Sequence, residues 1–367
     1  MALILTAEQQ ELQATTRKLL ADHSPGSRVR AFVDDSPDGV GGRDELWHQL
    51  SEKTGLTGLG LPEECGGTGS GNTELAVVLE EFGRALTPSP FFASVAWAGQ
   101  ALLVLDDEAA NRELLPGIAA GTVLASFAPL STDPAAASHP HAGRDGLTGT
   151  APLVVDGLLA DQIVVEALGG DGRTEYHLVD GAAAGLRRTA LISTDRTRAI
   201  ARLDFDRVAS RRLACRDGDA ARAAITDRAA LALAAEQLGG LLRCIEMTVE
   251  YAKMRVQFGR LIGSFQAVKH RLADLHTAGE LAVSLVRDAC RAADEEPDAF
   301  PVAARAALAH CSRAYATIAR EAIQLHGGIG FTWEHDAHLF YKRAHSSRQL
   351  LGGPEQHEAV VADRLAL

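Results

Sequence analysis

The chain has 367 residues, 46% of them hydrophobic and 23% charged, so it can bury a large core and has the composition of a globular protein. Its net charge of −12 argues against a nucleic-acid partner, because phosphate contacts require a basic surface. No apolar run reaches the roughly 18 residues of a membrane span, and no secretory signal opens the sequence. The five cysteines lack CxxC spacing, which favours reduced thiols. We therefore expect a cytoplasmic protein with neither a membrane nor a nucleic-acid partner.

Residues 6–115 favour helices. Thr6 and Gln9 have the spacing of a capping box, in which each side chain bonds to the other residue's backbone N–H. The P-E-E-C-G-G run that starts at Pro62 predicts a loop, because proline and paired glycines interrupt a helix. A further amphipathic helix is predicted over residues 73–86.

Around residue 120 the pattern changes to short β-prone runs separated by Gly, Asp and Pro clusters. These runs predict a small β-domain that extends to about residue 212. They cover residues 122–128, 147–155, 162–166 and 175–179.

The remainder, from about residue 218, has helical periodicity. Apolar residues recur every three or four positions along two long segments, and Pro301 suits the first turn of a third helix. A fourth helix is predicted over 335–350, with the Gly-Gly-Pro run at Gly352 as its stop. Consecutive helices of this length predict an antiparallel bundle.

The predicted fold class is therefore α+β and mostly α, in three parts. An N-terminal helical domain spans 1–117, a middle β-domain spans 118–215, and a C-terminal four-helix bundle spans 216–367.

Two motifs in the last part could hold a nucleotide cofactor. Arg255 precedes Phe258 by three residues; a guanidinium can pair bidentately with a diphosphate, and a phenyl ring can stack on an adenine. Gln324 precedes the pair Gly327 and Gly328, and glycines let a backbone approach phosphates closely. Taken singly, each motif is better explained by ordinary structure, Arg255 as a surface ion pair and Gly327 with Gly328 as a turn.

The two motifs, with this spacing on consecutive predicted helices, resemble those of the acyl-CoA dehydrogenase family, as does the loop at Pro62. The resemblance implies an acyl-CoA dehydrogenase fold, FAD as cofactor, α,β-desaturation of an acyl-CoA substrate, an electron-transfer acceptor, and a dimer or tetramer. In the family, the matching residues contact the FAD of a neighbouring subunit. The resemblance assigns that role to Arg255, Phe258, Gln324, Gly327 and Gly328, with Gln266 nearby.

The sequence departs from the family at the catalytic base, a carboxylate that removes the substrate's α-proton. Counted from Gln324, the usual base position is Leu351; counted back from Phe258, the other known position is Ala229. Neither residue is acidic. Glu236 lies on nearly the same helical face as Ala229 but about 10 Å further along the axis, so it is a weak candidate for the catalytic base.

A second departure lies in the predicted β-domain. The family's T-E-x-x-x-G-S-D segment, which holds the flavin, is replaced by A-S-F-A-P-L-S-T-D at residues 125–133. Its W-[IVT]-[ST] segment is replaced by P-L-V at residues 152–154. The residues that in the family contact a neighbour's FAD are present, whereas the segments that in the family form a subunit's own flavin pocket are replaced. This combination resembles the degenerate subunit of bacterial heteromeric acyl-CoA dehydrogenases, including those that act on steroid side-chain CoA thioesters.

Several functions remain open from the sequence. The chain could be a base-lacking subunit paired with a base-bearing chain, a self-sufficient homo-oligomer that uses Glu236, or a non-catalytic structural or binding member of the fold. A flavin monooxygenase variant is a more distant option, because that chemistry needs no α-proton base. His270 and His326 have no second ligand at metal-binding spacing, so we expect polar residues near an interface and no metal site.

Overall fold

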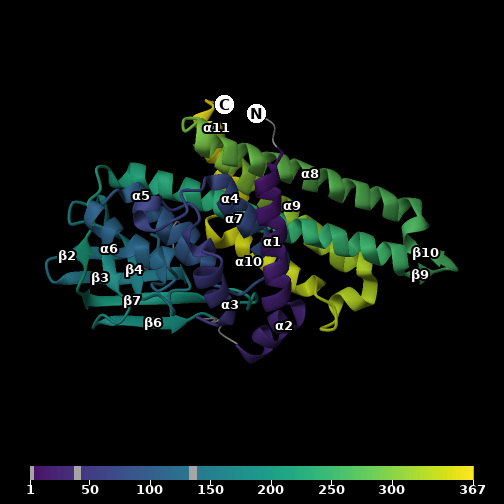
Figure 1. Ribbon diagram of the computed structural model, residues 1–367, viewed down its shortest axis with the longest axis horizontal. Coiled ribbons are helices and arrows are strands. Elements are labelled where there is room, and N and C mark those ends of the chain that lie inside the picture. Colours follow the sequence, from purple (N-terminus) through teal and green to yellow (C-terminus); the bar gives the residue numbers. More distant parts are fainter. Residues whose placement is uncertain (1–3, 37–42, 132–138, 367) are drawn as a thin grey trace. The chain divides into compact units, whose positions relative to one another are not determined.

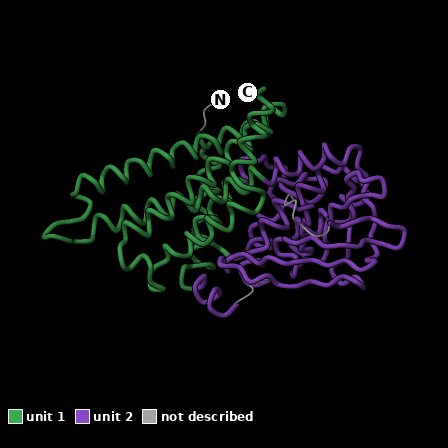
Figure 2. Tube along the Cα trace, turned by 180° about the vertical axis from the view of Figure 1, so that it is seen from behind, with its two compact units in different colours: residues 1–27, 76–87, 230–367 green, residues 28–75, 88–229 purple. Residues whose placement is uncertain are grey.

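The structure is a computed structural model that describes residues 4–36, 43–131 and 139–366. Its contacts divide the chain into two compact units (Figure 2). Unit 1 comprises residues 1–27, 76–87 and 230–367, and unit 2 comprises residues 28–75 and 88–229. Each unit combines segments that are distant in the sequence, so the residue ranges of the three predicted domains remain a prediction.

Unit 1 is helical (Figure 1). Its α9 packs against α8, α10 and α11. The helices that belong wholly or mostly to it are α1 (Ala7–His23), α4 (Asn72–Ala85), α7 (Gly218–Met254), α8 (Gln266–Glu295), α9 (Phe300–His326), α10 (Ala337–Leu350) and α11 (Pro354–Arg364).

Glycines allow two of these helices to touch. A Cβ at Gly239 of α7 would lie 1.7 Å from the Glu80 carbonyl oxygen of α4, and a Cβ at Gly83 would lie 1.8 Å from the Glu236 carbonyl oxygen. Any larger residue at either position would push the α4 and α7 backbones apart.

Unit 2 contains one mixed sheet with helical segments around it. The sheet order is β6-β7-β3-β2-β4-β5-β8, and β1 pairs in parallel with β4. The strands are β1 (Ala125–Ala128), β2 (His141–Gly143), β3 (Gly146–Val155), β4 (Gln162–Leu168), β5 (Thr174–Asp180), β6 (Leu186–Ala190), β7 (Ile200–Val208) and β8 (Arg211–Arg212). The helices are α2 (Gly26–Asp35), which starts in unit 1, α3 (Glu45–His48), η1 (Gln49–Lys53), η2 (Leu56–Gly58), η3 (Glu63–Cys65), η4 (Phe92–Gly99), α5 (Gln100–Leu105) and α6 (Glu108–Ala119).

The predicted fold class is confirmed, and so are several local predictions. Thr6 and Gln9 form the capping box of α1. The four β-prone runs correspond to β1, β3, β4 and β5. The predicted stop at Gly352 does end α10, but the helices do not end there: Pro354 begins a further helix, α11, because proline's fixed φ suits a first helical turn. The C-terminal bundle therefore has one more helix than the four predicted.

Candidate functional site: an exposed end of unit 1

The two sequence motifs lie at the same end of unit 1. Tyr251, near the end of α7, stacks on His326, the last residue of α9, with ring centroids 4.6 Å apart. Arg271, in the second turn of α8, pairs with Glu321 of α9 at 3.5 Å. These contacts bring together the last turns of α7 and α9 and the first turns of α8. The hairpin that joins α7 to α8 protrudes beyond them (Figures 1 and 2).

The hairpin consists of β9 (Val256–Gln257) and β10 (Arg260–Leu261), joined by a two-residue turn. Phe258 and Gly259 in this turn have φ values of 53° and 73°, as a type I′ turn requires. The left-handed region suits glycine and disfavours a bulky side chain. Phe258 is nevertheless there, and it is 92% exposed. Neither backbone preference nor burial inside the chain explains this phenylalanine, so a contact outside the chain is its best explanation.

The hairpin has two different faces, because side chains alternate along a strand. Gln257 lies opposite Arg260, and Val256 lies opposite Leu261. Arg255 lies two residues before Gln257 and therefore on the same face. One face is therefore cationic and polar, and the other is apolar and about half exposed, with Val256 at 52% and Leu261 at 43%.

The arginines of the cationic face are available to an external group. Arg255 is exposed, and no side-chain partner for it is found in the described part of the chain. The Arg260 guanidinium lies 4.0 Å from the centroid of the Phe265 ring, which also meets the Phe258 ring edge-on. At the start of α8, Gln266 is exposed and lies 2.8 Å from His270.

At the end of α9 the glycine pair is open to solvent. Gly327 is the C-cap, with φ 65° and ψ −145°, and its N–H bonds to the Gln324 carbonyl. This conformation explains glycine at position 327. Gly328 has no such constraint, and a Cβ there would meet nothing within 4 Å. The side chain of Gln324 is exposed as well. Nothing among the described residues requires glycine at position 328, whereas a closely approaching external group would.

Exposed apolar residues concentrate at this end of unit 1. Among the described residues, seven of the eleven large apolar side chains that are exposed lie at the end of α7, in the hairpin and in the segment after α9. Such a concentration is typical of an interaction surface. The seven are Met254, Val256, Phe258, Leu261, Ile329, Phe331 and Trp333.

The two histidines considered in the sequence differ in burial, and His270 is exposed. His326 is buried, and its Nδ1 lies 2.6 Å from the Ala322 carbonyl oxygen. Burial lowers the pKa of His326, which keeps the ring neutral at pH 7. Among the described residues, no group of three or more His, Cys, Asp or Glu side chains could hold a metal ion.

The positions of the family's catalytic base contain no carboxylate. Leu351 is the C-cap of α10, and Ala229 is buried in α7. The two glutamates that follow Leu351 in the chain are exposed and paired: Glu355 contacts Arg348 and Arg313, and Glu358 contacts Arg313.

Glu236 is more deeply buried than expected, at 6% exposure. Its Oε1 accepts a hydrogen bond of 3.0 Å from Nη1 of Arg343 on α10, which is itself 5% exposed. A proton on Glu236 would cancel one charge of this buried pair and leave the other uncompensated. The arrangement favours a structural role for Glu236 over a catalytic one.

The segment that replaces the family's flavin-holding motif is bonded within unit 2. The N–H of Leu130 donates to Oε2 of buried Glu166 at 2.8 Å, and Arg222 donates to Oε1 at 2.6 Å. The Tyr176 hydroxyl also donates to Glu166, and burial, together with this carboxylate, raises the pKa of Tyr176. The last two residues of the compared segment, 132 and 133, lie outside the described residues. Pro152, which replaces the expected aromatic residue, lies at a register irregularity of β3, because proline cannot donate to the sheet.

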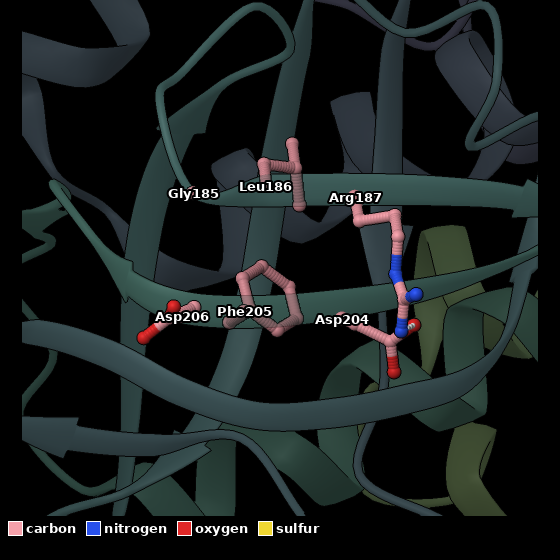
Figure 3. A pocket seen from close by; sticks show the side chains of 6 residues that line it. All are labelled: Gly185, Leu186, Arg187, Asp204, Phe205 and Asp206. Atoms are coloured by element: carbon pink, nitrogen blue, oxygen red, sulfur yellow. Dashed lines mark hydrogen bonds and ion pairs between the residues drawn. The ribbon is translucent and has the colours of Figure 1, made fainter.

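A depression of ≈ 410 Å³ on unit 2 contains none of the predicted site residues (Figure 3). It lies between β6 and β7, where Arg187 pairs with Asp204 at 3.0 Å. Asp204 also bonds to Thr150 and Arg202. These charged side chains form ion pairs with one another, so the depression is not a candidate site.

Comparison with known proteins gives two family matches. Residues 6–122 match the family described as Acyl-CoA dehydrogenase, N-terminal domain, and residues 218–366 match Acyl-CoA dehydrogenase, C-terminal domain. Acyl-CoA dehydrogenase IpdE2 of Mycobacterium tuberculosis (strain ATCC 25618 / H37Rv) is 39% identical over 351 residues, which cover 95% of this chain and 94% of that protein. The chain belongs to the acyl-CoA dehydrogenase family.

Two solved structures of this flavoprotein family are similar to the chain. A variant of the Tcur3481-Tcur3483 steroid ACAD is 32% identical, with a TM-score of 0.86 and 98% of each chain covered. The ChsE4-ChsE5 complex from Mycobacterium tuberculosis is 27% identical, with a TM-score of 0.87, and the match covers 100% of this chain and 99% of that one. The name of each structure gives a pair of different chains. No described helix of the present chain is long and apolar enough to cross a membrane.

Proposed function

We propose that this chain is the base-lacking subunit of a heteromeric, FAD-dependent acyl-CoA dehydrogenase. The observation that carries the proposal is the pairing of two features: an open, cationic end of unit 1 and hydrophobic residues at both base positions, Leu351 and Ala229. The chain then contributes to a cofactor that is held mainly by a partner chain, and the partner supplies the carboxylate. The similarity to two structures named as pairs of chains supports this arrangement.

The exposed end of unit 1 fits the cofactor's polar half. When bound, FAD supplies the hydride acceptor of the reaction. Arg255 would pair with the diphosphate through two N–H groups, and the exposed ring of Phe258 would stack on the adenine. Gly328 leaves room for a phosphate to approach the backbone, and Gln324 and Gln266 offer donors and acceptors beside it. These residues bind and orient; none of them moves a proton.

We propose an acyl-CoA thioester as the substrate, with a steroid-derived acyl group as the first class to test, because one of the similar structures is named a steroid ACAD. The α-proton must leave to a carboxylate while the β-hydride leaves to the flavin. Since this chain lacks that carboxylate at both expected positions, the partner's residue removes the proton.

Co-purification with the chain encoded next to it tests the proposal. The expected result is a complex that contains one FAD per two chains and desaturates an acyl-CoA, while each chain alone retains little flavin. Arg255→Gln should lower the FAD content of the complex, and Lys18→Gln, which changes an equally exposed cation on α1, should not. Full FAD occupancy and turnover by this chain alone would refute the subunit role. The absence of flavin from the chain and from the complex would instead favour a structural or binding member of the fold.

A further inference from the structure

One segment of the exposed end of unit 1, residues 251–273, is basic. Between residues 251 and 273 there are five Lys or Arg residues and no Asp or Glu, in a chain of net charge −12. All five side chains are exposed. They are Lys253, Arg255, Arg260, Lys269 and Arg271. We call these five residues, together with the exposed apolar residues Met254, Val256 and Leu261, the basic tip.

Most of this charge is not neutralised inside the chain. Arg271 pairs with Glu321, and Arg260 stacks on an uncharged ring. For Lys253, Arg255 and Lys269, no carboxylate of the described residues lies within ion-pair distance. Four cations therefore have no anionic partner among the described residues.

The cofactor accounts for only part of this excess. Each phosphate of a dinucleotide carries a single negative charge, and Arg255 with one further cation is enough to balance a diphosphate. Two cations are left over. Uncompensated like charges repel one another, so a set kept together on one surface points to an additional anionic contact.

The apolar residues of the basic tip indicate what kind of anion this is. Val256 and Leu261 form the half-exposed apolar face of the hairpin, and Met254 beside them is 71% exposed. A nucleic acid or a free phosphate would leave these side chains in water. A protein surface can cover them and neutralise the cations at its rim.

We propose that the basic tip selects the partner subunit, and that the partner presents an acidic surface with an apolar centre to it. The inference rests on the proposed heteromeric function and extends it from the cofactor to the choice of partner. A second copy of this chain is the competing occupant, because residues 294–298 at the far end of α8 are also acidic. An unlike chain is favoured, since a second copy brings no carboxylate to Leu351 or Ala229.

Charge reversal at the three tip cations other than Arg255 and the paired Arg271 tests the proposal, and the FAD content reports any share that one of them has in balancing the diphosphate. The tip variant is Lys253→Glu, Arg260→Glu, Lys269→Glu. The matched control, Lys18→Glu, Lys53→Glu, Arg216→Glu, makes the same change of net charge at exposed residues outside the tip. Association of each with the chain encoded beside it is measured at low and high salt, together with the FAD content of the complex. A melting curve of each variant verifies that it is folded.

The wild-type association should weaken as salt rises. The tip variant should associate roughly 10- to 100-fold more slowly at low salt and lose most of its salt dependence, whereas the control should stay within about threefold of wild type. Equal effects of the two variants, or a salt-independent wild-type affinity, would overturn the role of the tip while the heteromeric function stands. Failure of the wild-type chains to associate would overturn the heteromeric function itself. Tip-dependent self-association of this chain would show that a second copy is the occupant.

Discussion

The middle of unit 1 and its exposed end use the same residue types in opposite ways. In the middle, Arg343 bonds to Glu236 and Arg287 bonds to Glu80, and all four residues are buried. At the end, Lys253, Arg255 and Lys269 are exposed, and no carboxylate of the described residues lies within ion-pair distance of them. An acid in this fold is therefore not a candidate base merely because it is acidic. An exposed cation that has no acid beside it is more informative about where a functional site lies. The predictions below test this difference, in order of the expected change in the free energy of unfolding.

Removing one partner of a buried pair should have the largest effect. Arg343→Met removes the Arg343 guanidinium from the buried Glu236 carboxylate and should lower the free energy of unfolding by about 3–5 kcal/mol in urea denaturation. The double variant Glu236→Leu, Arg343→Met should recover most of that loss, because two apolar groups replace two charges. Glu236→Gln addresses the alternative of a self-sufficient enzyme: loss of turnover with FAD still bound would establish Glu236 as the base, against our expectation.

Acidic pH should have the next largest effect, through His357. This residue is 1% exposed in α11 and lies 3.2 Å from Nη1 of Arg305. Burial and the Arg305 charge lower the pKa of His357 from 6.5 to about 4. The unfolded chain therefore binds more protons between these values, so stability should fall as pH drops from 6.5 to 4, by about 3 kcal/mol from this group.

His357→Gln removes that titration and serves as the comparison. Its denaturation midpoint should change less than that of wild type between pH 6.5 and pH 4. Parallel curves for the two proteins would show that His357 is not the group that controls acid stability in this range.

Substitutions at the adjacent residues Gly327 and Gly328 distinguish a requirement of the backbone from a contact with an external group. Gly327→Ala forces alanine into a conformation that favours glycine and should cost about 1–3 kcal/mol. Gly328→Ala should change stability by less than about 0.5 kcal/mol, because its Cβ meets nothing in the chain. Gly328→Ala should still reduce the FAD content of the complex. Normal FAD content in that variant would mean that no cofactor atom approaches position 328.

Phe258→Asn should have the smallest effect on stability, and in the favourable direction. It replaces a strained, exposed phenylalanine with the Asn-Gly sequence that a type I′ turn prefers, so we expect a gain of a few tenths of a kcal/mol. Thermal unfolding measures this gain, and the flavin absorbance of the co-purified complex measures cofactor retention, which should fall. Unchanged flavin retention would remove Phe258 from the cofactor site.

Much of the fold was predictable because its signals are local. The Thr6–Gln9 capping box, the four β-prone runs and the long helices each follow from residues that are close in sequence. Strand β7 (Ile200–Val208) was not predicted individually, because charged residues interrupt its apolar pattern and its place between β6 and β3 is set by long-range pairing. Helix α11 was missed because a proline that follows two glycines can end one helix or begin the next.

The sequence by itself determined the family, the two candidate cofactor motifs and the absence of an acidic residue at positions 229 and 351, since each depends on residue identity at a given spacing. Only the tertiary structure decided that Glu236 is paired with Arg343, 107 residues away, and that the hairpin has a cationic and an apolar face. It also decided which charges are buried and paired and which have no counterpart. The physical reason is that electrostatic energy depends on distance and burial, and both are properties of the folded chain.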